Sequence, residues 1–463
     1  MKSPAAFNCA KRLACLGLPA IAFVFLSGCR SNNDSTEYAL PDYSDWASPT
    51  ETETLPPWNS LLSDPQLDAL IMEALEKNTD LRIAAQRVEL ARAQFQIQRS
   101  ERFPDLNGAG GYSRERRFDS TSELWNAVLS VPSWEIDLWG RVAALTESAQ
   151  QRFYAVEANR RAVEVSLTAE VANAYLNLLA LDAQVEIAEE TLRSREKSQS
   201  IIEDRHQAGI ASGLDRRQAA ILSDSAQRTL DELRRLQSRQ ENGLAILLGR
   251  VPGSIERSQG LLATEVPPQL PAGLPSTLIG RRPDLLEAEA QLRAADLDVV
   301  AARKAFLPTI SITGSIGFIS REFKDLLDSE AWSVTPAAVL PIFNSGRLRA
   351  NVRGSEALQT IAVETYLLAV RNAYREVENA LVDHQSHRSQ ATTSAEIVET
   401  SRERLDLTEQ RYREGVSSYF EVLDANRELF ANELDRIRSQ QAALASMVEL
   451  YRAVAADWMP SDP

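Results

Sequence analysis

The chain carries one sequence pattern twice, about 206 residues apart. The segment EVANA at 170–174 returns as EVENA at 376–380, and the glycine-containing segment that starts at Arg205 returns at Arg411. Upstream the offset is 204, so the two copies differ by two residues in one connecting segment. A period this long indicates a duplicated half-molecule rather than a solenoid of short repeats. We therefore expect two halves that fold alike, in an assembly that favours a tube or ring over an active-site cleft.

The N-terminus has the three parts of an export signal. Basic residues precede an apolar stretch at 13–26 and the ending Leu-Ser-Gly-Cys at Cys29. The stretch is shorter than the roughly 20 apolar residues of a membrane-spanning helix. The ending resembles the lipobox of bacterial lipoproteins, which implies a signal peptide at 1–28, S-diacylglycerol and N-palmitoyl groups on Cys29, and a lipidated tether at 29–62. Arg30 rather than aspartate follows the cysteine, which favours the outer membrane. An ordinary signal peptide with an incidental cysteine is the alternative.

Cysteine content and charge narrow the class of protein. Cys9 and Cys15 lie in the removed segment, so the mature chain keeps Cys29 alone and must be held together by packing. The whole chain has a net charge of −15, and loss of three signal-peptide cations leaves 47 basic and 65 acidic residues, or −18. Nucleic-acid binding needs a basic surface, so we expect no nucleic-acid partner.

Apolar periodicity and helix breakers divide the two halves into the same elements. The first half spans 63–248, the second 284–458, with an irregular connector at 249–283 and a tail at 459–463. The expected elements of the first half are two short helices (65–78 and 80–102), a β-hairpin at about 104–137, a long helix at 141–207 and a return helix at 214–248. Those of the second are a helix at 284–306, a hairpin at about 308–343, a long helix at 347–413 and a return helix at 420–458.

The helices show both start signals and coiled-coil patterning. Asp64-Pro65 is an acidic cap followed by proline, and Asp284 with Glu287 predicts a capping box. Each long helix is free of proline over 67 residues and would extend about 100 Å. The last return helix alternates apolar spacings of four and three, which is typical of coiled coils.

The hairpins alternate apolar and polar residues. Ile310, Ile312, Ile316 and Phe318 alternate with threonine, serine and glycine, and both hairpins carry charged tips. Strands of this length can cross a bilayer, and a soluble hairpin packed on a helical body is the alternative. Four strands cannot close a sheet in lipid, for which about eight is the minimum. A dimer would barely have room for side chains, whereas a trimer would give twelve strands and a lumen.

The segments WEIDLWGR, FLPTISITGSIG, LPIFNSGRL, RRPDL and YREGVSSYFEVLDANREL resemble the TolC-like outer membrane factors, in their lipoprotein (NodT-type) branch. The resemblance covers the chain from Trp58 to Trp458. It implies a membrane α+β fold, in which a homotrimer forms a twelve-stranded outer-membrane β-barrel that continues into a periplasmic α-helical barrel. It also implies an exit duct of a tripartite efflux pump for small molecules such as drugs. The partners would be a periplasmic membrane-fusion adaptor and an inner-membrane transporter of the resistance-nodulation-division class.

The resemblance assigns two groups of residues near the turns that end the long helices. The adaptor-docking group comprises Gly209, Ser212, Gly213, Leu214, Gly415, Val416, Ser418 and Tyr419. Gly209, Gly213 and Gly415 are expected to permit a positive φ in tight turns. The entrance-constriction group comprises Tyr412, Ser417, Glu421 and Asp424, whose acids would form rings in a trimer and favour cations. Ser417 departs from relatives that carry aspartate there, which puts a closed state that uses that acid in doubt.

Other functions are less well supported by the sequence. His384 and His387 lie three residues apart, but no cysteine or third histidine accompanies them, so we expect two exposed histidines and no metal site. No phosphate-binding glycine loop of the Walker type and no converging catalytic set is present, so an enzyme is not expected. A type I secretion duct and a structural coiled-coil lipoprotein of the periplasm remain as alternatives, and the cargo is not encoded in any motif.

Overall fold

The computed structural model describes residues 62–118, 120–258, 260–266 and 281–454, which all belong to a unit that begins at Ser44. Cys29, the signal peptide, the tether up to residue 61, the middle of the connector and the C-terminal tail lie outside the described residues. The elements in chain order are α3 (Pro65–Lys77), α4 (Thr79–Ser100), β1 (Asn107–Arg117), β2 (Ser120–Glu135), α5 (Arg141–Gln207), α6 (Gly213–Leu247), η2 (Leu261–Ala263), α8 (Pro283–Lys304), β3 (Thr309–Ser320), η3 (Phe323–Asp325), β4 (Glu330–Val339), α9 (Arg347–Arg413) and α10 (Tyr419–Ala453).

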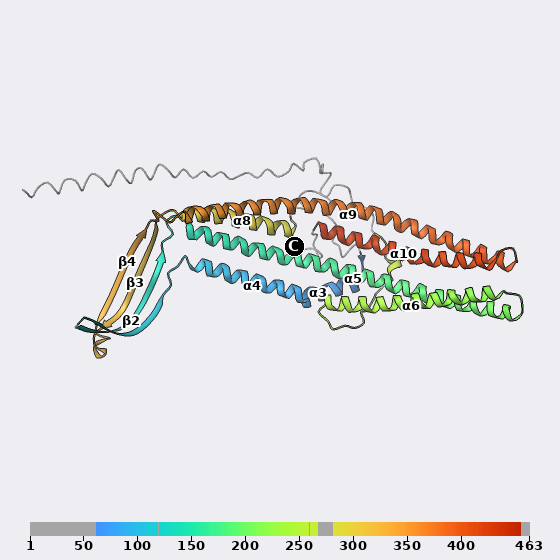
Figure 1. Cartoon of the computed structure of the whole chain (residues 1–463), viewed down its shortest axis with the longest axis horizontal. Helices are drawn as coiled ribbons and strands as arrows, with labels where there is room; N and C mark the ends of the chain where they lie inside the picture. Colours follow the sequence, from blue (N-terminus) through green and yellow to red (C-terminus); the bar gives the residue numbers. More distant parts are fainter. Residues whose placement is uncertain (1–61, 119, 259, 267–280, 455–463) are drawn as a thin grey trace, which may run out of the picture. The chain divides into compact units, whose positions relative to one another are not determined.

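The two hairpins form one antiparallel sheet in the order β1-β2-β3-β4 (Figure 1). The halves meet where β2 pairs with β3, and the register shifts between Val131 and Trp134. A Cβ at Gly317 would overlap the backbone oxygen of Ala127, so this position of β3 requires glycine for the close approach of β2. β1 and β4 are the two outer strands of this sheet, and each has one edge without a partner among the described strands.

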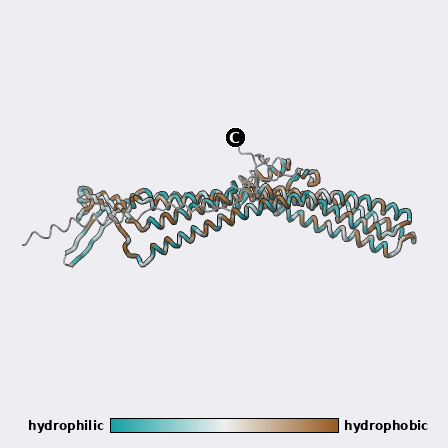
Figure 2. Tube along the Cα trace, turned by 90° about the horizontal axis from the view of Figure 1, so that it is seen from above, coloured by the Kyte–Doolittle hydropathy of each residue, from teal (hydrophilic) through white to brown (hydrophobic). Residues whose placement is uncertain are grey.

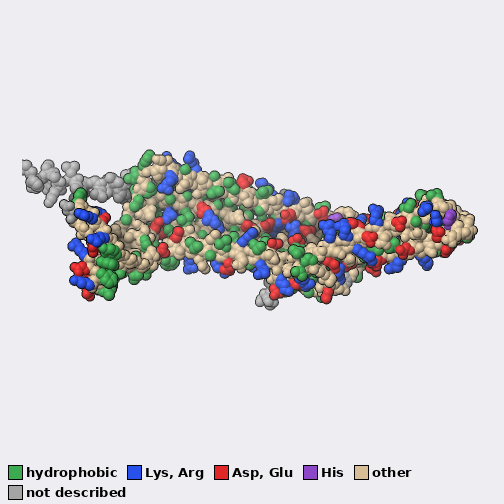
Figure 3. Space-filling view, turned by 60° about the horizontal axis from the view of Figure 1, so that its bottom comes forward, with side chains coloured by type: hydrophobic (Ala, Val, Ile, Leu, Met, Phe, Trp, Pro, Cys, Tyr) green, Lys and Arg blue, Asp and Glu red, His purple; other side chains and the backbone are tan. Residues whose placement is uncertain are grey.

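The register gives the sheet two chemically different faces. Ile316 pairs with Leu129 on one side and Trp332 on the other, and side chains of paired residues share a face. The next pair along, Ser315 and Ser333, lies on the opposite face and shares a hydroxyl hydrogen bond of 2.8 Å. Figure 3 shows hydrophobic side chains gathered on the sheet beside a group of charged ones. The alternation in the sequence therefore produces one apolar and one hydroxyl-rich face.

The strand ends differ from the sequence expectation in two places. The charged segment of the first hairpin is largely strand, since β1 runs to Arg117. Arg114 of β1 forms an ion pair with Glu123 of β2 at 3.3 Å. Opposite charges on paired strands stabilise the pairing, so the charged residues extend the ladder instead of ending it. β4 stops at Val339 although the return strand was expected to reach Phe343, because Val339 lies opposite Thr309, the first residue of β3, and β3 offers no partner beyond it.

Each half contributes a pair of long antiparallel helices (Figure 1). α5 packs on α6, α9 packs on α10, and the shorter α4 and α8 lie against α5. α5 and α9 both have 67 residues and begin after a glycine with positive φ, Gly140 at 72° and Gly346 at 85°. Figure 2 shows hydrophobic and hydrophilic residues interleaved along these helices, as expected for helices that bury one face against a neighbour.

No helix within the described ranges combines the length and the apolar character that crossing a membrane requires.

The start of α8 differs from the predicted capping box. Its N-cap is Arg282, Pro283 occupies the first helical position, and Glu287 accepts a hydrogen bond from Asn159 of α5 instead of capping the helix. Proline at the first position has no N–H that needs a cap, and the Arg282 side chain can only donate hydrogen bonds, so α8 begins without a side-chain cap bond. The capping box was therefore a wrong prediction.

Arg282 joins three segments of the second half. Its guanidinium pairs with Asp284 and Glu376, each at 2.8 Å, and Nη1 donates to the carbonyl of Ala453 at 2.6 Å. The first half has the corresponding contact, because Asn78 donates its Nδ2 to the carbonyl of Leu247 at 2.9 Å. In each half, the residue at the N-cap position of the helix that precedes the hairpin thus holds the last turn of the return helix; it is Asn78 for α4 and Arg282 for α8.

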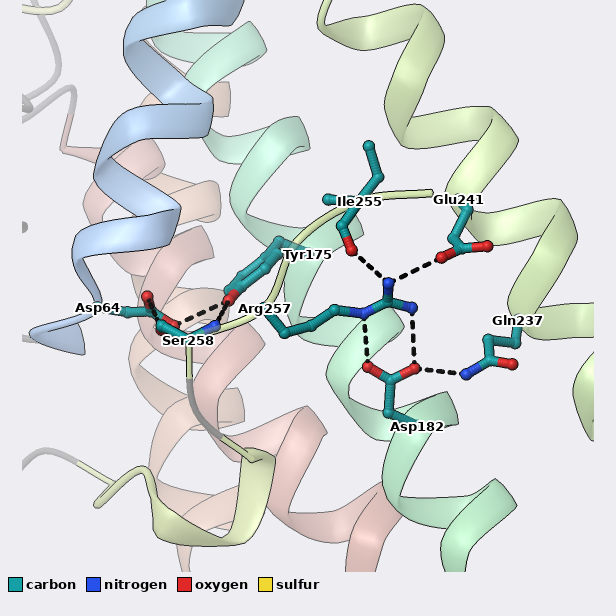
Figure 4. A network of polar contacts seen from close by, with 8 residues as sticks. All are labelled: Asp64, Tyr175, Asp182, Gln237, Glu241, Ile255, Arg257 and Ser258. Atoms are coloured by element: carbon teal, nitrogen blue, oxygen red, sulfur yellow. Dashed lines mark hydrogen bonds and ion pairs between the residues drawn. The ribbon is translucent and has the colours of Figure 1, made fainter. Parts of the chain in front are cut away.

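A polar network fastens the connector to the helices (Figure 4). Asp64, the N-cap of α3, accepts hydrogen bonds from Tyr175 of α5 at 3.1 Å and from Ser258 of the connector. Arg257 pairs with Asp182 of α5 at 2.9 Å and with Glu241 of α6 at 2.8 Å. The connector segment at 255–258 therefore ties α3, α5 and α6 together.

Replacing Arg282 with alanine should destabilise the fold. The side chain is 7 % exposed, and its loss leaves the Glu376 carboxylate and the Ala453 carbonyl without their donor. We expect a loss of about 2–4 kcal/mol, below the full cost of a buried pair because both acids are partly exposed. Thermal unfolding in detergent would measure it, with the exposed neighbour in Arg281→Ala as control. Equal melting temperatures for the two variants would contradict the role given to Arg282.

Stability should fall between pH 10 and 12 through Tyr175. Burial and then the Asp64 carboxylate raise the pKa of Tyr175 to about 12, against about 10 for tyrosine in an unfolded chain. The folded state therefore keeps a proton that the unfolded state loses, and the stabilisation is complete below about pH 10 and lost as pH rises through about 12, at about 1.4 kcal/mol per unit. Denaturation of Tyr175→Phe should show a shallower decline over this range than the wild type. The exposed Tyr154→Phe is the control, and parallel curves for all three proteins would refute the assignment.

Candidate functional site

The ends of the two helix pairs use the same backbone turn. After α5, Gly209 has φ of 75° and Ile210 N donates to Arg205 O at 2.8 Å. After α9, Gly415 has φ of 76° and Val416 N donates to Arg411 O at 2.9 Å. This left-handed residue with a hydrogen bond back into the last turn is a common helix ending. The duplicated sequence therefore gives duplicated turns.

The starts of the return helices are less alike. Ser212 caps α6 in a full capping box, because its hydroxyl accepts from Asp215 N at 3.1 Å and the Asp215 carboxylate accepts from Ser212 N at 3.1 Å. Ser418 caps α10 without a side-chain hydrogen bond. Gly213, expected to need a positive φ, is the first residue of α6 and does not have one. That expectation was wrong, because the chain has already turned at Gly209 and residue 213 needs only helical geometry.

A hydrophobic cluster joins the two ends, and we call it the end cluster. Its buried members are Ile202, Ala219, Leu222, Tyr419, Val422 and Leu423. Tyr412 packs against the cluster with its ring 5.4 Å from that of Tyr419, and the Arg205 guanidinium lies 5.4 Å from the Tyr412 ring centre. Burial, followed by nearby Tyr412, raises the pKa of Tyr419 to about 12. Two residues of the candidate groups, Tyr412 and Tyr419, thus contribute to packing between α5, α6, α9 and α10.

The turns also expose apolar side chains at equivalent positions. Leu214 and Val416, both in the expected docking group, are each 66 % exposed. Ile210 and Phe420 are also exposed, and the sequence analysis did not name them. Ile210 aligns with Val416 and Leu214 with Phe420 at the 206-residue offset, so the repeat alignment was the signal that would have found them.

The two acids of the constriction group differ in their partners, because one of them pairs with an arginine that the sequence analysis did not identify. Glu421 and Asp424 both lie exposed on α10, but the Asp424 carboxylate pairs with Arg404 of α9 at 2.8 Å. No ion pair to Glu421 occurs among the described residues. Ser417 is half-buried, and its hydroxyl oxygen is buried with no hydrogen-bond partner among the residues that the structure describes. An ion pair between two helices depends on their packing register, which the sequence alone did not supply.

A buried arginine next to the end cluster links α5 to α10 and also contacts α6. Arg195 is 5 % exposed, lies 4.9 Å from the ring centre of Phe430 and donates to Leu222 O at 3.2 Å. Burial, followed by the charge of Arg427, lowers the pKa of Arg195 to about 10. Contact with an aromatic face partly offsets the cost of burying a cation. The sequence does not indicate that Arg195 is buried, because it lies among other charged residues in a segment that looks like an exposed helix face.

The histidines differ from the expectation of two exposed side chains. His384 is 3 % exposed and its Nδ1 lies 3.0 Å from the hydroxyl of Ser446 on α10, while His387 is half-buried. Burial, then the charges of Arg388 and His387, lowers the pKa of His384. Among residues 62–118, 120–258, 260–266 and 281–454, no cluster of three histidine, cysteine or acidic side chains has a geometry that suits a metal ion.

Comparison with known proteins gives one consistent result. The family described as "Outer membrane efflux protein" matches residues 70–250 and 274–456. The solvent efflux pump outer membrane protein SrpC of Pseudomonas putida is 36 % identical over 96 % of this chain and 98 % of its own. The outer membrane protein OprJ of Pseudomonas aeruginosa is 38 % identical over 87 % of this chain and 86 % of its own. The open-state structure of the MtrE outer membrane channel of Neisseria gonorrhoeae matches with a TM-score of 0.82 and 31 % identity, over 89 % of this chain and 94 % of that one.

Alanine substitution should distinguish the turn glycines that have a positive φ, Gly209 and Gly415, from Gly213, which has helical geometry. Gly209→Ala and Gly415→Ala place a Cβ on a residue with positive φ, which costs about 1–2 kcal/mol. Gly213→Ala adds a Cβ at a helical position where, of the described atoms, only His206 Cε1 lies within 4 Å, at 3.8 Å, so we expect no loss of stability. Hydrogen exchange of the backbone amides at 205–216 would report local opening. Equal protection in Gly209→Ala and Gly213→Ala would contradict this reading of the turn.

Proposed function

Because this chain belongs to the outer membrane efflux protein family, we propose that it is the exit duct of a tripartite efflux pump that expels small molecules such as drugs. As a member of this family it is an outer membrane channel protein that extends into the periplasm, and not an enzyme. The observation that carries the proposal is the duplicated arrangement of one four-stranded sheet continued by two 67-residue helices.

We propose a homotrimer on the basis of the sheet edges. β1 and β4 each present an unpaired edge among the described strands, and backbone groups left unpaired in lipid cost several kcal/mol each. Pairing β4 of one copy with β1 of the next would satisfy both edges, and three copies would close a sheet of twelve strands with a lumen. The apolar face with Ile316, Leu129 and Trp332 would then contact lipid, and the face with Ser315 and Ser333 would line the passage.

The N-terminal cysteine would anchor each subunit in the outer membrane. Cys29 would carry the diacylglycerol and palmitoyl groups, and the tether at 29–62 would lead to the Asp64 cap of α3. Two or more acyl chains give stable membrane attachment, whereas one chain gives reversible binding. This anchor would supplement the closed sheet.

The partners would meet the duct at the helix ends farthest from the sheet. The four exposed apolar side chains at the turns would dock a periplasmic membrane-fusion adaptor; they are Ile210, Leu214, Val416 and Phe420. Exposed apolar groups on a helical surface are a common feature of protein docking sites. The adaptor would connect the duct to an inner-membrane transporter of the resistance-nodulation-division class. The similarity to an outer membrane protein of a solvent efflux pump supports cargo of small apolar molecules.

The constriction would lie beside these turns. In a trimer, three copies of Tyr412, Ser417, Glu421 and Asp424 would surround the axis. Rings of carboxylates in a narrow passage attract cations and exclude anions. Because Tyr412 packs against the end cluster, it would hold the helices that form the wall of the constriction in place.

Planar-bilayer recording tests the duct and its acids together. The purified protein should form channels that favour potassium over chloride, and Glu421→Ala with Asp424→Ala should lower this preference by at least about twofold, since three pore charges are lost per ring. Asp231→Ala, which removes an exposed acid of α6, is the control. A folded oligomer without conductance would contradict the proposed duct. Unchanged selectivity in the double variant would mean that both acids are ordinary solvent-exposed residues that do not line the passage.

A further inference from the structure

We propose that Arg404 sets the charge selectivity of the proposed constriction by neutralising part of its acidic surface. The proposal rests on the function proposed above and identifies a residue outside the group that the sequence predicted. Arg404 would leave Glu421 as the acid with the least compensated charge. Selectivity would therefore depend on a balance of three α10 acids, Glu421, Asp424 and Glu428, and one α9 cation.

The contacts of Arg404 cross between α9 and α10. One guanidinium nitrogen lies 2.8 Å from Asp424 Oδ2, and the other pairs with Glu428. Asp424 and Glu428 are four residues apart and therefore share one face of α10. Arg404, Asp424 and Glu428 are each about half exposed, so the group faces solvent and not the packed core.

Glu421 lies on the same stripe of α10 but outside this group. It precedes Asp424 by three residues, which keeps it on the same face of the helix. Its side chain is exposed, and the described residues include no cation paired with it. Asp424, Glu428 and Arg404 together carry one net negative charge, and Glu421 adds a second.

The duplication supplies an internal comparison. At the 206-residue offset, Arg404 aligns with Ser198, Asp424 with Gln218 and Glu428 with Leu222, so the first helix pair lacks the whole group. The backbone turn is the same in both pairs. The charged group is therefore a feature of the second pair alone and is not required to build this kind of helix end.

The physical role of Arg404 is in the potential of the passage rather than in stability. Ion pairs between exposed side chains stabilise a fold by about 0–1 kcal/mol, so the structure does not depend on this one. The potential inside a narrow passage follows the sum of nearby charges, whether or not they are paired. Removing Arg404 from each subunit would leave the fold intact and make the constriction more negative.

The test compares charge variants by reversal potential in a potassium chloride gradient. Arg404→Gln should raise the permeability ratio of potassium to chloride by at least about twofold. Arg404→Lys should return it to the wild-type value, and Arg404→Gln combined with Asp424→Asn, which restores the net charge, should do the same. Arg402→Gln is the matched control, because it removes an equal charge from α9 where Arg402 pairs with Glu399 and Glu433. Circular dichroism and the oligomer size of each variant confirm folding.

Two results would overturn the inference in different ways. If the wild-type protein forms channels and Arg404→Gln has the same permeability ratio of potassium to chloride as Arg402→Gln, the role of Arg404 is refuted. The proposed duct is then unaffected. A wild-type oligomer that forms no channel would refute the proposed duct and, with it, the passage on which Arg404 is proposed to act.

Discussion

The pairing of β2 with β3 is the contact on which the rest of the structure depends. It joins the two halves of the chain in one sheet, with Ile316 opposite Leu129 and Ser315 opposite Ser130. Because α5 and α9 each begin a few residues after a strand of this sheet, the same pairing places their starts at one end. The remaining contacts, α10 on α5 and α8 between α5 and α9, follow from two parallel long helices that leave a common base.

The two halves share their backbone and differ in their side chains. The turns after α5 and α9 have the same hydrogen bonds and the same left-handed glycine. Asp215 is used in a capping box, whereas its counterpart Glu421 is exposed and has no ion-pair partner within the described part of the chain. Duplication thus preserved the geometry that closes a helix pair and left the exposed charges free to diverge. The selectivity proposed for the second pair arises from that divergence.

Several elements were readable because their signals are local. The 67-residue helices follow from the absence of proline and from the flanking glycines, and the Asp64-Pro65 start follows from capping preferences. The start of α8 was misread because Glu287 accepts a hydrogen bond from Asn159 of α5 instead of capping its own helix. The N-cap residue Arg282 donates to Glu376 and Ala453, which lie 94 and 171 residues away along the chain. His384 was misread for the same reason, since its burial depends on Ser446 of another helix.

The sequence by itself determined the duplication, the type of the elements, the length of the long helices and the positions of the turns, because period, proline and glycine act over a few residues. It also placed Glu421 and Asp424 near a turn. Only the tertiary structure decided which of those acids is paired, which apolar side chains are exposed, and that Arg195 and Tyr412 pack between the two helix pairs. Those outcomes depend on the rotation and register of one helix against another, and packing across the whole chain sets both.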